Sequence, residues 1–146
     1  MTQLNNSFQL LVKKLGLDAA ESLNEEIISL EVGDFTCHFK EYPANHITLY
    51  TVLEKMPEVG MDLLLSILSE NHFSEQLLSP VFSYDQNNQC FLIWNRQPVQ
   101  GLTGDGILEQ LEAVMAFNET VQTILSEGGN DDHFAVSQRE PHGIHC

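Results

Sequence analysis

Basic residues are scarce in this chain. Lysine and arginine together number 6 among 146 residues, whereas aspartate and glutamate number 21, so the formal net charge is −15 and the isoelectric point is about 4.4. A nucleic-acid binder needs a basic surface that displaces counterions from phosphates, and docking on anionic lipid needs positive charge as well. The composition therefore excludes nucleic acid and the membrane surface as electrostatic partners.

Cysteines and long apolar runs are few as well. Cys37, Cys90 and Cys146 are an odd number at wide spacing, which indicates reduced thiols of a cytosolic protein and not a disulfide framework. No segment reaches the roughly 18 consecutive apolar residues that span a bilayer. Lys13 and Lys14 follow the first apolar residues, the reverse of a secretory signal. We therefore expect a cytosolic protein.

Apolar residues are present in periodic patterns that predict secondary structure. They make up 42% of the chain, enough for the core of one domain. From residue 27 a spacing of two predicts strands over 27–32, 35–40 and 47–53, which form an antiparallel meander because their connections are short. Before them, helical spacing predicts a helix that ends at Gly16 and carries one apolar stripe, formed by Leu4, Phe8, Leu11, Val12 and Leu15.

The second half of the chain repeats this change of period. Residues 61–68 predict a short helix that is apolar around most of its circumference, and burying such a helix on several sides favours a subunit partner. The next pattern predicts a hairpin of two strands, 81–84 and 90–94. A long helix is predicted over 105–126, ending before Gly128-Gly129, and a mobile tail over 128–146. The prediction is an α+β domain of residues 1–127 in the order α-β-β-β-α-β-β-α, with helices packed on an antiparallel sheet.

Residue types that carry catalysis occur, but not in catalytic arrangements. Cys37 and His38 are neighbours on a predicted strand, so their side chains point to opposite faces and are poorly placed to act as nucleophile and base. The tail offers ligands for zinc or copper without rigid support or a closed four-ligand spacing, namely His133, His142, His145 and Cys146. We therefore predict a protein that is not an enzyme and has no cofactor and no metal site.

The apolar pattern favours a binding surface instead. Residues 27–32 carry apolar side chains on both faces of a predicted strand, next to the apolar stripe of the first helix. A sheet with an edge strand and an adjacent apolar groove can accept an extended peptide by strand addition, in which main-chain hydrogen bonds give affinity and side-chain pockets give specificity. The pattern thus favours a partner that is itself a polypeptide.

Four segments of the sequence, taken together and in order, resemble a known family. They are Phe8-Gln-Leu-Leu-Val-Lys-Lys-Leu-Gly-Leu17, Asp34-Phe-Thr-Cys-His-Phe39, Ile47-Thr-Leu-Tyr50, and Leu63–Leu68 followed by Glu70-Asn-His-Phe73. This series resembles the first helix, the second and third strands, and the dimer helix with its exit in the class I chaperones of bacterial type III secretion, the Tir-chaperone family. The resemblance covers residues 4 to 126, and the strong acidity agrees with it.

The resemblance implies a homodimeric, ATP-independent chaperone of the bacterial cytoplasm. Such a protein binds the N-terminal region of a secreted effector, keeps it extended and assists its delivery to the secretion apparatus, whose components are further partners. The effector-binding residues implied by family position are Phe8, Leu11, Leu15, Ile28, Leu30 and Phe39. The implied dimer interface consists of Leu64, Leu65, Leu68 and Phe82.

Two other classes of protein stay open at this point. One is an acidic regulator that sequesters a basic partner such as a transcription factor, and its affinity should collapse with salt because charges screen each other. The other is a metal- or thiol-dependent enzyme that uses the tail. Deleting residues 130–146 would inactivate such an enzyme and leave a chaperone with its dimer and its client.

Overall fold

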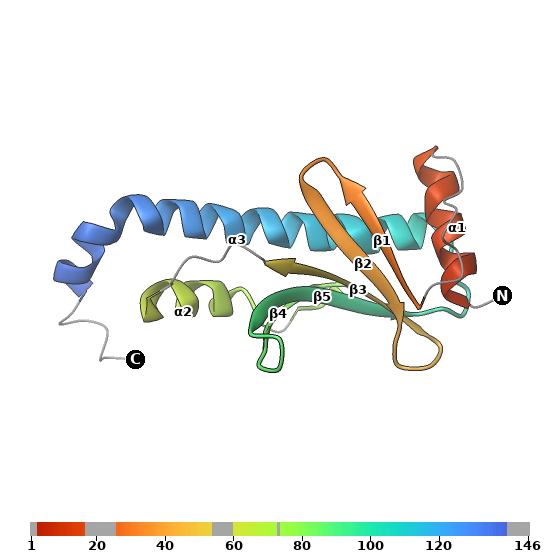
Figure 1. The fold of residues 1–146 in the computed structure, drawn as a ribbon, viewed down its shortest axis with the longest axis horizontal. Coiled ribbons are helices and arrows are strands. Elements are labelled where there is room, and N and C mark those ends of the chain that lie inside the picture. The colour runs from red at the N-terminus through yellow and green to blue at the C-terminus, as the bar shows by residue number, and fades with distance from the viewer. Residues whose placement is uncertain (1–2, 17–25, 54–59, 73, 140–146) are drawn as a thin grey trace.

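The computed structural model of the chain describes residues 3–16, 26–53, 60–72 and 74–139 (Figure 1). Within them, three helices and five strands follow one another in the predicted order α-β-β-β-α-β-β-α. The bounds are α1 (Gln3–Leu15), β1 (Ile27–Val32), β2 (Phe35–Glu41), β3 (His46–Leu53), α2 (Met61–Ser69), β4 (Val81–Asp85), β5 (Cys90–Pro98) and α3 (Gly104–Arg139). The predicted α+β fold class is confirmed.

The strands form one antiparallel sheet in the order β1-β2-β3-β5-β4. The predicted meander β1–β3 and the predicted hairpin β4–β5 meet where β3 pairs with β5. This arrangement leaves β1 and β4 as the two edge strands. Gly33, at the turn between β1 and β2, has a positive φ of 62°, a conformation that glycine adopts without steric penalty.

Helices cover one face of the sheet, and the other face has no helix on it among the described residues. Along β3, Ile47, Leu49 and Leu53 are buried, whereas the alternating positions such as Tyr50 are partly exposed. Figure 1 shows α3 running along the sheet and α1 crossing its start. Where α1 meets the sheet, the ring of Phe8 contacts the ring of Phe39 edge-on at 5.9 Å. Below, the covered face is called the inner face and the other the outer face.

A buried amide cluster fixes α3 on the inner face. Gln110 of α3 is fully buried, and its Nε2 donates to the carbonyl of Ile47 at 3.1 Å. Its Oε1 accepts from Nε2 of Gln97 at 2.6 Å, and Nδ2 of Asn95 donates to the Gln110 carbonyl at 3.0 Å. Buried amides need such partners because an unpaired one costs about 1–3 kcal/mol. The pattern of apolar residues carried no signal for this cluster.

The last helix is longer than predicted. The sequence pattern placed its end at residue 126, before Gly128-Gly129, but α3 continues through both glycines to Arg139. A glycine inside a helix costs about 1 kcal/mol relative to alanine, so a glycine pair does not by itself end a helix. The predicted end is therefore wrong, and residues 140–146 of the predicted tail lie outside the described residues.

Candidate functional site

The open edge of β1 is the first surface that could bind a polypeptide. Among the described residues, β1 pairs with β2 on one side only, so main-chain groups along its other side have no strand partner there. Ile27 and Val32, at the two ends of the strand, are large hydrophobic side chains that remain exposed. An exposed apolar edge strand is a template for an added strand.

Most of the predicted effector-binding residues lie behind this edge and not on it. Phe8, Leu11, Ile28 and Phe39 are at most 2% exposed, and they form the core between α1 and the β1–β2 hairpin. These four side chains offer no area to a ligand in this conformation. Helical and strand periodicity identified them as an apolar face, but periodicity does not tell whether the fold covers that face. The other two predicted residues, Leu15 and Leu30, are partly buried and pack against the core.

Two clefts adjoin the β1–β2 hairpin where it passes α3. Pairing between β2 and β3 covers only residues 38–41 against 47–50, so the two strands diverge beyond His38. A cleft of about 590 Å³ opens there, with Thr36, Val52 and Gln122 among its lining residues. A second cleft, of about 390 Å³, has Val32 in its wall. Side chains of a peptide paired with β1 would have pockets within reach.

The exposed apolar face of α2 is the second candidate surface. Ile67 is its buried residue, whereas Met61, Leu65 and Leu68 are 68%, 52% and 41% exposed. Leu77, in the connection to β4, is 96% exposed. Exposed apolar side chains gathered on one short helix indicate a protein interface.

The predicted interface residues divide between this face and the core. Leu65 and Leu68 lie on the exposed face of α2, and Leu64 is partly buried against the core. Phe82 is buried on β4 and stacks on Phe91 with ring centroids 5.2 Å apart. Phe82 therefore packs within its own subunit and has no free surface for a second one, because it lies on the inner face of the edge strand.

An asparagine closes the edge of β4. Nδ2 of Asn71, just after α2, donates to the carbonyl of Phe82 at 2.9 Å, and its Oδ1 accepts the N–H of Phe82 at 2.8 Å. The side-chain amide thus pairs with the edge as one residue of a neighbouring strand would. The two edges of the sheet therefore differ, since β1 is open and β4 is occupied at its second residue.

Among the described residues, the candidate catalytic groups Cys37 and His38 lie apart, on opposite faces of β2. Burial raises the pKa of the Cys37 thiol to about 12, which keeps it protonated at neutral pH. His38 points to the outer face, where its Nδ1 lies 2.8 Å from Oγ of Ser29. In the described part of the chain, no three His, Cys, Asp or Glu residues gather as metal ligands. The predicted tail ligands His142, His145 and Cys146 lie outside the described residues, as does the side chain of His133.

Comparison with known proteins agrees with this geometry. The model of the Tir chaperone protein (CesT) family matches residues 8–122. The YopE regulator of Yersinia pestis is 32% identical over 114 residues, which are 77% of this chain and 84% of that protein. No helix among the described residues has the length and hydropathy needed to cross a membrane.

Solved structures share the fold. A chain of the ExoT–SpcS complex from Pseudomonas aeruginosa has a TM-score of 0.67 and 29% identity, over 81% of this chain and 96% of that chain. A chain of the complex of the Yersinia pestis type III secretion chaperone SycH with a fragment of YscM2 has a TM-score of 0.66 at 17% identity, over 84% and 99% of the two chains. The family match, the identity to the YopE regulator and the shared fold together show that the chain belongs to the Tir chaperone protein (CesT) family of type III secretion chaperones.

Proposed function

We propose that this protein is a cytoplasmic, ATP-independent chaperone that binds the N-terminal region of a type III secreted effector and keeps it extended until export. It acts by binding and not by catalysis. Support comes from the relatives, since one of the similar solved structures is a complex of ExoT with SpcS. The observation that carries the proposal is the open, apolar edge of β1, because an extended polypeptide is the ligand that such an edge fits.

Binding energy alone can maintain the extended state. A ligand that binds only the unfolded form of a client segment shifts its folding equilibrium by mass action. Main-chain pairing with β1 requires an extended segment, because the main-chain groups of a helix or of an inner strand are already paired with each other. Nucleotide chemistry is therefore unnecessary for holding the client, and release can follow from competition at the export apparatus.

We further propose that two copies pair through the exposed face of α2. Met61, Leu65 and Leu68 supply apolar area there. Removing such area from water stabilises association by roughly 25 cal/mol per Å² of apolar surface before the entropic cost of association is subtracted. The pair would carry twice −15, or −30, which favours solubility.

The β1 edge can be tested with a client fragment. The protein that co-purifies with the chaperone from its native bacterium supplies an N-terminal fragment for binding measurements. Val32→Asp places a charge on the open edge, and Tyr84→Asp places the same charge on β4, where Tyr84 is also exposed. We expect at least tenfold weaker binding for Val32→Asp and little change for Tyr84→Asp, with both circular dichroism spectra unchanged.

Two outcomes of this measurement would reject the proposal. Equal binding by both variants would remove β1 as the site of the client. Affinity for the fragment that collapses between low and high salt would favour the acidic regulator of a basic partner, because screening weakens charge attraction and leaves apolar burial largely intact.

A further inference from the structure

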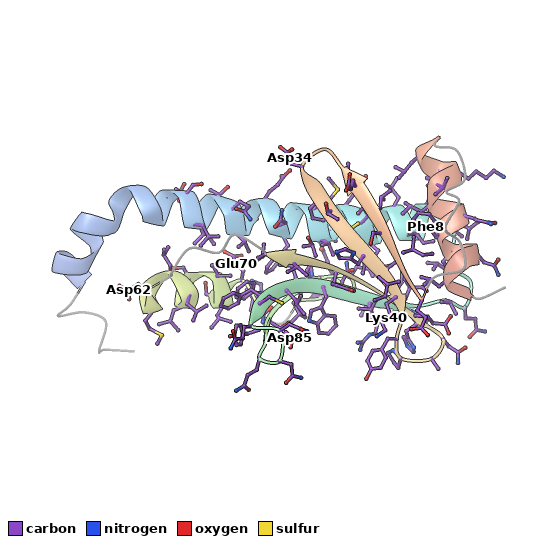
Figure 2. All side chains as sticks on the ribbon, in the orientation of Figure 1. Phe8, Asp34, Lys40, Asp62, Glu70 and Asp85 are labelled. Carbon is purple, nitrogen blue, oxygen red and sulfur yellow. The ribbon has the colours of Figure 1, made fainter. Side chains whose placement is uncertain are left out.

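Two cations and two aromatic rings gather on the outer face of the sheet. The guanidinium carbon of Arg96, on β5, lies 5.0 Å from the ring centroid of Trp94 and 5.8 Å from that of Tyr42. Nζ of Lys40, on β2, lies 5.6 Å from the same Tyr42 ring. Figure 2 labels Lys40 near the β2–β3 turn, at the end of the sheet remote from α2.

Strand register places these groups in one row. Lys40 pairs with Thr48, and Thr48 pairs with Arg96, so the three residues lie side by side across β2, β3 and β5. Neighbouring strands are about 4.8 Å apart, so the two cationic residues start roughly 10 Å from each other. The basic row, as Lys40, Tyr42, Thr48, Trp94 and Arg96 are called below, occupies a face that no described helix covers.

Arg96 is held in a fixed orientation. Its Nε donates to Oγ1 of Thr48 at 3.0 Å, and Oγ1 of Thr48 donates to the carbonyl of Tyr42. Rings of Tyr42 and Trp94 contact the guanidinium as well. Fixing a side chain before binding reduces the conformational entropy that binding would otherwise lose. The terminal nitrogens of Arg96 remain as donors for a ligand.

Neither cation of the row pairs with a carboxylate of the described residues. An ion pair among the described residues joins Lys14 and Asp105, on α1 and α3, and does not involve the row. Within those residues no carboxylate lies within 4.0 Å of Lys40 or Arg96, although the chain has 21 acidic residues and only 6 basic ones. In so acidic a protein, two clustered cations without carboxylate partners call for an anionic ligand.

We propose that the basic row binds an acidic segment of the client polypeptide. An arginine presents two parallel N–H donors that match the two oxygens of a carboxylate, whereas lysine offers a point charge. The net charge of −15 repels acidic chains, so an acidic client segment is attracted here only where its carboxylate meets Arg96 and Lys40. Such a site selects among clients more than it adds affinity. The inference rests on the proposed function for the identity of the partner.

A peptide titration tests the row without any client. The probe is the blocked peptide acetyl-Asp-Glu-Asp-Glu-amide, and the control probe is acetyl-Asn-Gln-Asn-Gln-amide. The readout is the NMR resonance of the Trp94 indole Nε1–H, which the wild type and every variant carry and whose ring contacts Arg96, at an ionic strength near 0.15 M. We expect saturable shifts with the acidic peptide only, at least tenfold weaker binding after Arg96→Gln, and intermediate binding after Arg96→Lys, which keeps the charge but not the paired donors.

A matched variant controls for charge. Lys13→Gln removes one positive charge from the exposed side of α1, and we expect it to leave the titration unchanged. Equal shifts with both peptides, or equal binding by wild type and Arg96→Gln, would overturn the inference. Client capture separates the two proposals. A chaperone that holds its client but ignores the acidic peptide refutes the basic row alone, whereas loss of client capture by Val32→Asp bears only on the β1 edge.

Discussion

At the scale of single residues, Gly104 controls how closely α1 and α3 approach. A β-carbon built at this position would lie 3.0 Å from the backbone carbonyl oxygen of Leu10. The ion pair between Lys14 and Asp105 joins the same two helices, but both side chains are well exposed, so it contributes little. Steric fit at Gly104 therefore matters more than charge for this contact.

We expect Gly104→Ala to lower the free energy of unfolding by about 1–2 kcal/mol, because the backbone of α1 must shift to admit the methyl group. Chemical denaturation measures the change. Gly60→Ala is the control, since a β-carbon there meets no atom within 4 Å and the backbone angles are ordinary. We expect it to change stability by no more than about 0.5 kcal/mol. Equal stability of both variants would show that the helices separate without penalty.

Residue roles were harder to predict than residue burial. Phe8 and Phe39 belong to the predicted apolar faces, and the structure buries both in the core, because only the packed fold decides which apolar face is covered. Lys40 and Arg96 carried no signal at all, since they lie far apart in the sequence. Their proximity depends on the register of β2, β3 and β5, which the sequence pattern does not specify.

At the scale of elements, strands and helices followed from periodicity. The alternation that predicted the meander is the alternation of buried and exposed residues along β3. The end of α3 did not follow, because glycine is a weak signal when helical residues continue beyond it. Asn71 shows a further limit of prediction from periodicity. Its side chain takes the place of a strand beside β4, and a single polar side chain leaves no periodic pattern in the sequence.

We expect Asn71→Ala to open the edge of β4. The N–H of Phe82 loses its acceptor, and hydrogen exchange at this amide should accelerate about five- to tenfold, which corresponds to the roughly 1 kcal/mol of one hydrogen bond. Light scattering should also reveal assemblies larger than those of the wild type at rising concentration, because an unblocked edge invites pairing.

Two further variants make this prediction specific. Asn71→Asp keeps an acceptor for the Phe82 N–H but loses the donor to its carbonyl, so we expect partial protection of the amide. Asn87→Ala removes an amide from the exposed β4–β5 turn and should behave as wild type. Unchanged exchange at Phe82 in Asn71→Ala would mean that another group closes the edge.

At the scale of the whole molecule, the exposed face of α2 predicts the oligomeric state. Leu65→Glu combined with Leu68→Glu places charges at two exposed positions, so the subunit fold should persist while apolar association is lost. We expect the mass in solution to fall from twice 16.5 kDa to 16.5 kDa. Light scattering measures the mass, and circular dichroism checks the fold.

A control with the same added charge separates the loss of the apolar α2 surface from the effect of a higher net charge. Gln86→Glu combined with Asn87→Glu adds two negative charges to the β4–β5 turn, outside α2, and should leave the dimer intact. A dimer that survives the leucine changes would remove α2 from the interface, and a monomeric wild type would reject the proposed pairing altogether.

The unequal edges of the sheet have a consequence for solubility. A client strand that docks on β1 becomes the new edge strand of the sheet. No side chain pairs with that edge in the way that Asn71 pairs with β4. The sequence of the client then decides whether further strands add to the sheet. Clients with proline or charge on the outward side of the docked segment would end it, whereas smooth apolar ones would risk recruiting more chains.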